Sequence, residues 1–394
     1  MKRANGFSLI ELMVSLIVML IVSGAAIAAL MQAQRVTTGI GMEASVQENL
    51  RAGMHFLVRD LMQTGEGIPQ AGISIPNNAA GASAIVLPAG LAGFFPATAK
   101  LSQITPGNAV GEDAKTVDPV SGAVLDGLLK TDIISVLYED NTLVSSAAGP
   151  GGISPPLLNA YPVIQAAPAT PVCTGAFAAS GLTVTLAPTC FTLPGGPVPL
   201  SKGDLIMFHN ANGTALEFVT NVAGTVITFA AGDPAGLNQT GLPNGTVANL
   251  NVAGTPTSIS RVYLVTYYVD SNTNPSQPQL IRQVNYPNYP SAAAATYPAQ
   301  AVADDIENLS FSYDIINSTA PAASYPNGPG DAAAPAAPDT PFDIRAVNVT
   351  IAGRSDRPYV AMATPQYFRN NLSTQVGVRS LAFANGFPTP TTLP

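Results

Sequence analysis

The residue near the start of the chain that is best placed to do chemistry is a carboxylate inside an apolar run. Glu11 is the single acid among about two dozen apolar or small residues that begin at Phe7, after a short basic leader. A charged side chain in a membrane-length helix costs roughly 2.5–3.5 kcal/mol near the bilayer centre and less near its edge. A cut between Gly6 and Phe7 would create an α-amino group, and an amine–carboxylate contact at about 4 Å contributes on the order of 4 kcal/mol at an effective dielectric near 20. Glu11 is therefore a candidate partner for such an amine.

The element that must position Glu11 is a helix of membrane length over residues 7–30. About 24 residues at 1.5 Å each span roughly 36 Å, more than the ~30 Å hydrocarbon core of a bilayer. Lys2 and Arg3 precede the apolar run, so the N-terminus is expected in the cytoplasm and the rest of the chain outside it. Two alternatives are a plain signal peptide cut after Ala28 and a simple uncleaved anchor. The length of the run and the acid at its start disfavour the signal peptide.

The apolar run continues into an amphipathic pattern over residues 31–66. No proline interrupts residues 7–68, so the sequence predicts one helix of about 55–60 residues, with a bend or local melting near Gly39 and Gly41 and an end at Gly65. Apolar residues recur mostly at spacings of three or four, which predicts one buried stripe. They are Val36, Ile40, Val46, Leu50, Met54, Leu57, Val58 and Leu61.

Residues 67–384 read as a β-rich head, and residues 385–394 as a disordered tail. Only 10% of the chain is charged, while Gly and Pro each number 35, which favours many turns. The predicted fold class is α+β, with an antiparallel sheet laid on the amphipathic half of the helix. The expected strands are 132–138, 182–186, 204–209, 215–222, 225–229, 261–270, 279–284, 306–314, 344–352 and 375–383. Residues 202–230 are expected to form a β-hairpin module of three strands.

Residues 141–200 contain no Asp, Glu, Lys, Arg or His and are read as an uncharged insertion. A turn-rich loop is the preferred interpretation, and a low-charge surface that faces a neighbour is the alternative. Cys173 and Cys190 both lie in this insertion. Two cysteines in an exported chain most simply pair, and closing a loop of this size contributes roughly 3 kcal/mol in the entropic account.

Little in the sequence favours catalysis, a cofactor or a metal site. The net charge of −8 argues against a general nucleic-acid surface. His55 and His209 lie in no recognisable nucleophile or ligand motif. Residues 270–274 imitate the first ligands of a calcium loop, but Pro275 takes the position that needs Gly, and Ile281 stands where the bidentate Glu should be. Five arginines crowd the C-terminal region and are expected at solvated strand positions, with a local basic patch as the alternative: Arg345, Arg354, Arg357, Arg369 and Arg379.

The segment Gly6-Phe-Ser-Leu-Ile-Glu-Leu-Met13 strongly resembles the prepilin signal of type IV pilins and type II secretion pseudopilins. The resemblance implies that a membrane prepilin peptidase cuts after Gly6 and methylates the amine of Phe7. It also implies that Glu11, fifth in the mature chain, helps to register an incoming subunit against the N-terminus of its neighbour. A pilin-like fold, with a helix that is half anchor and half spine of the head, follows from the same resemblance.

Further segments resemble the minor pilins of the PilW type. They are Phe56–Gly65, Gly203-Asp-Leu-Ile206, Val262–Val269, Leu280-Ile-Arg282, Asp305–Tyr313 and Ile344–Val349. This resemblance implies a non-enzymatic subunit of the inner membrane and then of the pilus, with other minor and major pilins, the inner-membrane assembly platform and the lipid bilayer as partners. A minor pseudopilin of type II secretion and a pilus-borne adhesin that uses residues 141–200 are the alternatives.

Overall fold

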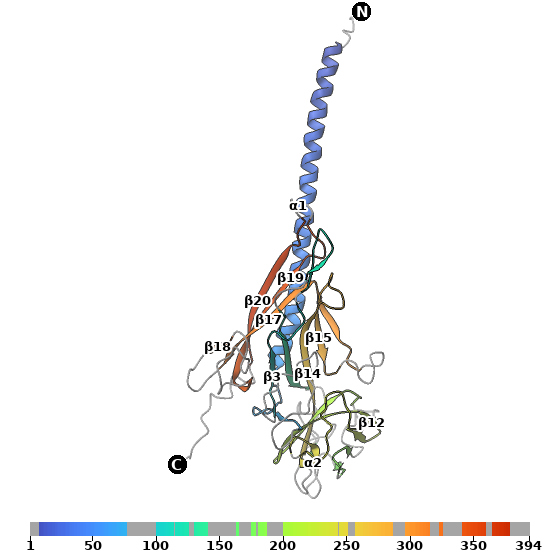
Figure 1. The fold of residues 1–394 in the computed structure, drawn as a ribbon, viewed down its shortest axis with the longest axis vertical. Coiled ribbons are helices and arrows are strands. Elements are labelled where there is room, and N and C mark those ends of the chain that lie inside the picture. Colours follow the sequence, from blue (N-terminus) through green and yellow to red (C-terminus); the bar gives the residue numbers. More distant parts are fainter. Residues whose placement is uncertain are drawn as a thin grey trace, which may run out of the picture.

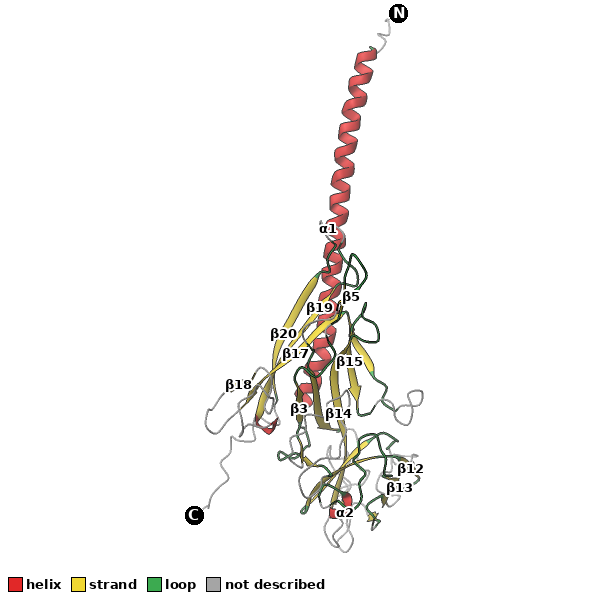
Figure 2. Ribbon diagram, viewed as in Figure 1, coloured by secondary structure: helices red, strands yellow, loops and turns green. Residues whose placement is uncertain are grey.

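A long helix projects from a β-rich head in the computed structural model (Figure 1). Figure 2 shows that the strands are confined to the head, where they lie along the lower half of the helix. The architecture is therefore the predicted α+β fold. The structure describes residues 8–76, 100–113, 115–125, 130–140, 163–164, 175–178, 180–186, 200–242, 244–250, 257–286, 296–315, 323–325, 341–359 and 365–378. The expected tail, residues 385–394, lies outside these ranges.

The helix α1 spans Leu9–Gln63, 55 residues, which agrees with the predicted length. At 1.5 Å per residue it is about 80 Å long. The α-helix continues through Gly39 and Gly41, so local melting there is wrong, and the alternative of a bend stays a prediction. At the C-terminus Gly65 takes a positive φ of 78°, and its N–H donates to the carbonyl of Leu137 at 2.8 Å. The helix thus ends by joining directly to a strand of the head.

The predicted apolar stripe is buried except for its first two residues, and Val58 is half-buried. The head covers Val46, Leu50, Met54, Leu57 and Leu61, together with Met42. Val36 and Ile40 are 49% and 62% exposed, so their predicted burial is wrong. The head first touches the helix where the Tyr359 hydroxyl donates to the carbonyl of Arg35 at 3.2 Å. The stripe therefore continues beyond the surface that the head can cover.

The main sheet is organised around one long strand, β14 (Thr257–Asp270). Along one edge β14 pairs with β6 (Ile133–Glu139) and β7 (Val163–Ile164). Along the other edge it pairs with β10 (Leu205–Asn210) and β15 (Gln279–Val284). The outer strands are β3 (Ile104–Gly107) beside β6, β11 (Gly213–Phe218) beside β10 and β16 (Gln300–Asp304) beside β15. All pairs are antiparallel, and the predicted hairpin at residues 270–275 joins β14 to β15.

A second antiparallel sheet packs against α1. Its strand order is β18 (Ala323–Tyr325), β17 (Ile306–Ile315), β19 (Ile344–Arg354) and β20 (Arg369–Gly377). Alternate residues of β19, Val347, Val349 and Ile351, are fully buried in the same core as Leu50 and Leu57. A short 3₁₀ turn, η3 (Pro341–Asp343), precedes β19. The last strand begins at Arg369, six residues before its predicted start.

The hairpin module of residues 202–230 contains four strands in two sheets. The predicted strand 215–222 divides into the end of β11 and the start of β12 (Asn221–Ala223). The Val219 N–H still donates to the carbonyl of Asp204, the residue before β10, whereas the Thr220 N–H donates to the carbonyl of Thr228 in β13 (Val226–Thr228). β13 in turn pairs with β9 (Thr183–Leu186), which pairs with β8 (Gly175–Phe177). The chain therefore changes sheets at one peptide.

The remaining described elements are short, and the buried residues of the described ranges form three apolar cores. Two-stranded ladders join β1 (Ile73–Ser74) to β2 (Lys100–Leu101) and β4 (Thr116–Val117) to β5 (Val124–Leu125), and α2 spans Val247–Leu250. The first core joins α1 to both large sheets. The second and third lie on the two faces of β10, where Leu205 and Met207 enter one and Ile206 and Phe208 the other. This explains why β10 is apolar on both faces.

Candidate functional site

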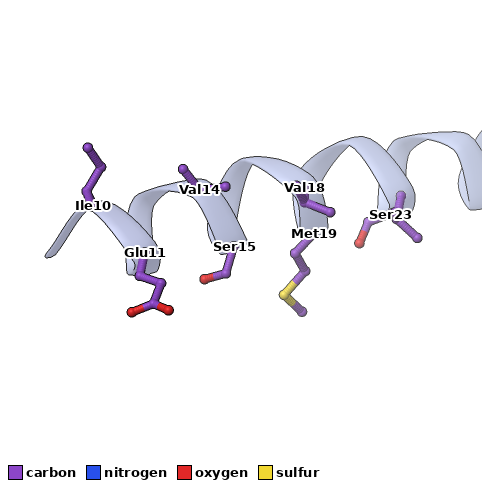
Figure 3. Close-up of a pocket in the computed structure, with 8 residues that line it drawn as sticks. Ile10, Glu11, Val14, Ser15, Val18, Met19 and Ser23 are labelled. Carbon is purple, nitrogen blue, oxygen red and sulfur yellow. The ribbon is translucent and has the colours of Figure 1, made fainter. Parts of the chain in front are cut away.

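The exposed half of α1 places Glu11 in the first helical turn. Figure 3 shows the Glu11 carboxylate extending from the helix on the same side as Ser15, Met19 and Ser23. Residues four apart share one face of a helix, which explains this row. The Ser15 hydroxyl donates to the carbonyl of Leu12 at 2.9 Å, so its hydrogen bond is formed within the helix. Glu11 forms no ion pair with any residue in the described ranges. Its carboxylate is thus available to a group outside the chain's described part.

The segment that carries Glu11 is apolar and uncovered. The helix contains an eighteen-residue window apolar enough to cross a membrane, and none of that window is buried by the head. Side chains along it are half to three-quarters exposed, among them Leu9 at 78% and Met19 at 72%. Water-soluble proteins rarely expose a continuous apolar surface of this kind, which marks contact with a membrane or with other chains. Acidic groups are also favoured in a first helical turn by the helix dipole.

The structure places only part of the predicted processing site. Gly6 and Phe7, and also Cys173 and Cys190, lie outside the described residues. Glu11 lies four residues after Phe7, so the expected cut and the acid are separated by about one helical turn. The predicted cleavage, methylation and disulfide stay predictions.

Sequence reasoning missed a second polar site at the other end of α1. Asp60 is a charged residue near the C-terminus of α1, yet its side chain is fully buried. It accepts hydrogen bonds from the Tyr267 hydroxyl at 2.6 Å and from Arg282 Nε at 2.6 Å, and it pairs with Arg59 at 3.2 Å. Asp60 lies three residues after Leu57, at the spacing of the buried stripe, and this was the signal in the sequence. The contact links the last turn of the helix to the main sheet.

Two of the five C-terminal arginines are buried rather than solvated. Arg354 is 1% exposed; its Nη1 donates to Glu307 at 3.3 Å, its Nη2 donates to the carbonyl of Ser276 at 2.9 Å, and it lies over the ring of Tyr367. Arg345 is 9% exposed and donates to the carbonyls of Phe342 and Ile344. Arg357 and Arg369 are exposed as expected, and Arg379 lies outside the described residues. The two buried arginines therefore have a structural role at the start and the end of β19.

The described residues show no cluster of side chains that could hold a metal ion. Within these ranges no group of three or more His, Cys, Asp and Glu side chains converges. The Asp270 carboxylate accepts hydrogen bonds from Thr273, and Asn274 accepts them from Ser276, so these side chains cap the β14–β15 turn. His55 lies on the exposed side of α1, and His209 is exposed on β10.

Comparison with known proteins identifies the N-terminal segment. Residues 1–27 match the family described as the prokaryotic N-terminal methylation motif. No curated protein and no solved structure matches the chain. The matched segment contains Gly6, Phe7 and Glu11 and supports a pilin-type protein, processed by a prepilin peptidase and assembled with other pilins. It ends within the exposed helix and therefore does not separate a pilin from a pseudopilin.

Proposed function

We propose that this chain is a minor pilin of the PilW type that helps to prime and build a type IV pilus. The observation that carries the proposal is the position of Glu11. It lies within a methylation motif and in the first turn of an apolar helix that the head does not cover. In this account a prepilin peptidase cuts after Gly6 and methylates Phe7. Before assembly the subunit lies in the inner membrane, with its N-terminus in the cytoplasm and its head in the periplasm. It then enters the fibre at or near its tip.

The two parts of α1 make different contacts, and this difference supports the mechanism. Residues 42–63 hold the head, while residues 9–34, which precede the contact between Tyr359 and Arg35, form a free rod of about 39 Å. That rod is long enough to span the ~30 Å core of a bilayer, and the same exposed side chains can later pack against neighbouring helices. One surface thus serves the membrane before assembly and the fibre after it.

Glu11 favours transfer of the subunit from the membrane into the fibre. In lipid an uncompensated carboxylate is unfavourable by a few kcal/mol, less near the edge of the bilayer. The new amine of Phe7 on a neighbouring subunit offers about 4 kcal/mol of attraction at 4 Å and an effective dielectric near 20. Assembly therefore replaces a destabilised charge by an ion pair and sets the axial position of each subunit.

Substituting Glu11 tests this proposal directly. Glu11→Gln removes the charge and keeps the shape, so the protein should reach the membrane at the normal level yet decrease at least tenfold in sheared fibres, since each 1.4 kcal/mol is tenfold. Glu43→Gln is the matched control, because Glu43 is an exposed glutamate farther along the same helix. Normal incorporation of the Glu11→Gln protein would refute the pairing.

The same features fit a minor pseudopilin of type II secretion, which is the alternative function. Co-purification separates the two: pilus subunits and the pilus assembly platform support the proposal, whereas secretion-system subunits support the alternative. The adhesin alternative involves residues 141–200, of which the structure describes only 163–164, 175–178, 180–186 and 200. Deleting this insertion should abolish adhesion and leave piliation intact if that alternative holds.

A further inference from the structure

The head contains a cavity of about 300 Å³ near the end of α1, beside the Asp60 contact. Three tyrosines form its walls: Tyr138 from β6, Tyr263 from β14 and Tyr297 from the segment before β16. Arg282 and Val284 of β15 and Gln300 of β16 also line it. This volume lies at the lower limit of small-molecule sites, which are typically aromatic hollows with a few polar groups. It therefore suits one small ring rather than an extended ligand.

The tyrosine rings are held in place before any ligand arrives. The Tyr263 hydroxyl donates to Asp140 at 3.1 Å, and the Tyr297 hydroxyl donates to Asp204 at 2.5 Å. The ring of Tyr263 meets those of Tyr138 and Tyr297 edge to face, with centroids 5.9 and 6.0 Å apart. Because their hydroxyls are engaged, these residues present ring surfaces to the cavity. Preorganised walls reduce the entropy lost on binding.

The charges behind the walls are balanced by close partners. Arg261 pairs with both Asp140 and Asp204, and Arg282 pairs with Asp60. Burial raises the pKa of Tyr138 to about 12, so its phenol stays neutral at physiological pH. Arg282 is the cationic side chain that lines the cavity. The site therefore combines neutral aromatic walls with one guanidinium group, which is already paired with Asp60 on its far side.

Two polar groups of the cavity keep hydrogen-bonding capacity. Arg282 uses Nε for Asp60 and Nη2 for a long, 3.4 Å contact to the Tyr138 hydroxyl, so among the described residues Nη1 keeps its donors. The Gln300 side chain is exposed, and its amide has no hydrogen bond to any residue that the structure describes. A guanidinium nitrogen can meet a carboxylate oxygen, and an amide can both donate to and accept from hydroxyl groups.

We propose that this cavity binds one sugar ring of a glycan, with a preference for a hexuronate. The C–H face of a sugar carries partial positive charge and complements the negative face of an aromatic ring. The hydroxyls of the sugar would meet Gln300, and its carboxylate would meet Arg282. An aromatic side chain of a peptide would fill the hollow but leave both groups without partners. This binding activity is additional to assembly and does not depend on it.

Ligand binding can be measured by saturation-transfer NMR on the full chain in a zwitterionic detergent without a sugar headgroup. The probes are D-glucuronate, D-galacturonate, D-glucose, D-galactose and N-acetyltyrosinamide. Val284→Phe places a ring in the cavity, and Gln300→Ala removes the amide from the outer strand. Gln277→Ala is the control, because Gln277 is exposed at the far end of the β14–β15 hairpin. Thermal unfolding confirms that each variant is folded.

The expected result is saturation transfer to the uronates that exceeds transfer to the neutral sugars and weakens as salt is added. Val284→Phe should abolish it, Gln300→Ala should weaken affinity about fivefold to tenfold, and Gln277→Ala should leave it unchanged. Equal transfer in the wild type and in both cavity variants would overturn the proposal. Absence of transfer to every sugar would also overturn it, as would binding of N-acetyltyrosinamide alone.

Discussion

Removing the buried carboxylate of Asp60 should destabilise the head by about 3–5 kcal/mol. This is the usual cost of leaving one charge of a buried pair without its partner. Asp60 is fully buried, and the side chain of Arg282 is only 12% exposed, so little water can replace the lost contact. The Tyr267 hydroxyl would lose its acceptor as well. The change to test is Asp60→Leu, which removes the charge and keeps an apolar side chain in the core.

A double-mutant cycle isolates the ion pair. Arg282→Met alone should cost about 2–3 kcal/mol, because Asp60 keeps Arg59 and Tyr267 as partners. The double variant leaves neither charge buried and should cost only about 2 kcal/mol, mostly from the unpaired tyrosine hydroxyl. The coupling between the two positions should therefore be at least about 3 kcal/mol.

Urea unfolding of the detergent-solubilised protein measures these differences. Tyrosine emission can follow the transition, since the chain has twelve tyrosines and no tryptophan. Asp356→Ala is the control: the Asp356–Arg357 pair is 3.9 Å apart, and both side chains are more than half exposed. It should change stability by less than about 0.5 kcal/mol. Additive single substitutions, or a double variant no more stable than Asp60→Leu, would show that the pair does not lock the helix to the sheet.

Two further changes test the packing and the electrostatics of the head. Gly41→Ala should stabilise α1 by up to about 1 kcal/mol, because an added Cβ meets no atom within 4 Å. Gly53→Ala should lose that gain, because its Cβ would lie 2.9 Å from Leu280. Equal urea midpoints for the two variants would contradict this expectation. Burial raises the pKa of Asp305 to about 6, so the folded state binds its proton more tightly than the unfolded state, and stability is lost as pH rises from about 4 through 6. Asp305→Asn, which suits the positive φ of 58°, should stabilise the head by about 1 kcal/mol above pH 6 after allowance for solvent screening, and by nothing below pH 4. A gain that is the same at pH 4 and pH 7 would contradict the assignment to Asp305.

Regular patterns of side chains made the helix and most strands predictable. The absence of proline and the three–four spacing of apolar residues located α1, and the alternation of Val347, Val349 and Ile351 located β19. The limit of burial along α1 was not predictable, because it depends on how far Tyr359 and its neighbours reach toward Arg35. The sheet change near Thr220 was not predictable either, since it follows from which strands compete for one N–H group.

Long-range partners explain what the sequence did not show at the polar sites. Asp60 and Arg282 are more than two hundred positions apart, so neither residue alone indicates a buried pair. Arg354 reads as one more polar residue of an alternating strand until the carbonyls of Pro275 and Ser276 are placed beside it. The cavity walled by Tyr138, Tyr263 and Tyr297 likewise gathers three elements that are distant in sequence. The Glu11 site differs because all its parts lie within a few residues.

The most direct test of the account is N-terminal mass spectrometry of the membrane-extracted protein, with and without the prepilin peptidase. The account predicts a mature chain that starts at N-methylated Phe7, and a full-length chain that keeps Met1 when the peptidase is missing. A start near Ala29 would identify a cleaved signal peptide and remove Glu11 from the mature protein. An intact Met1 in both strains would contradict processing, and with it the pairing of Glu11 with a neighbour's amine.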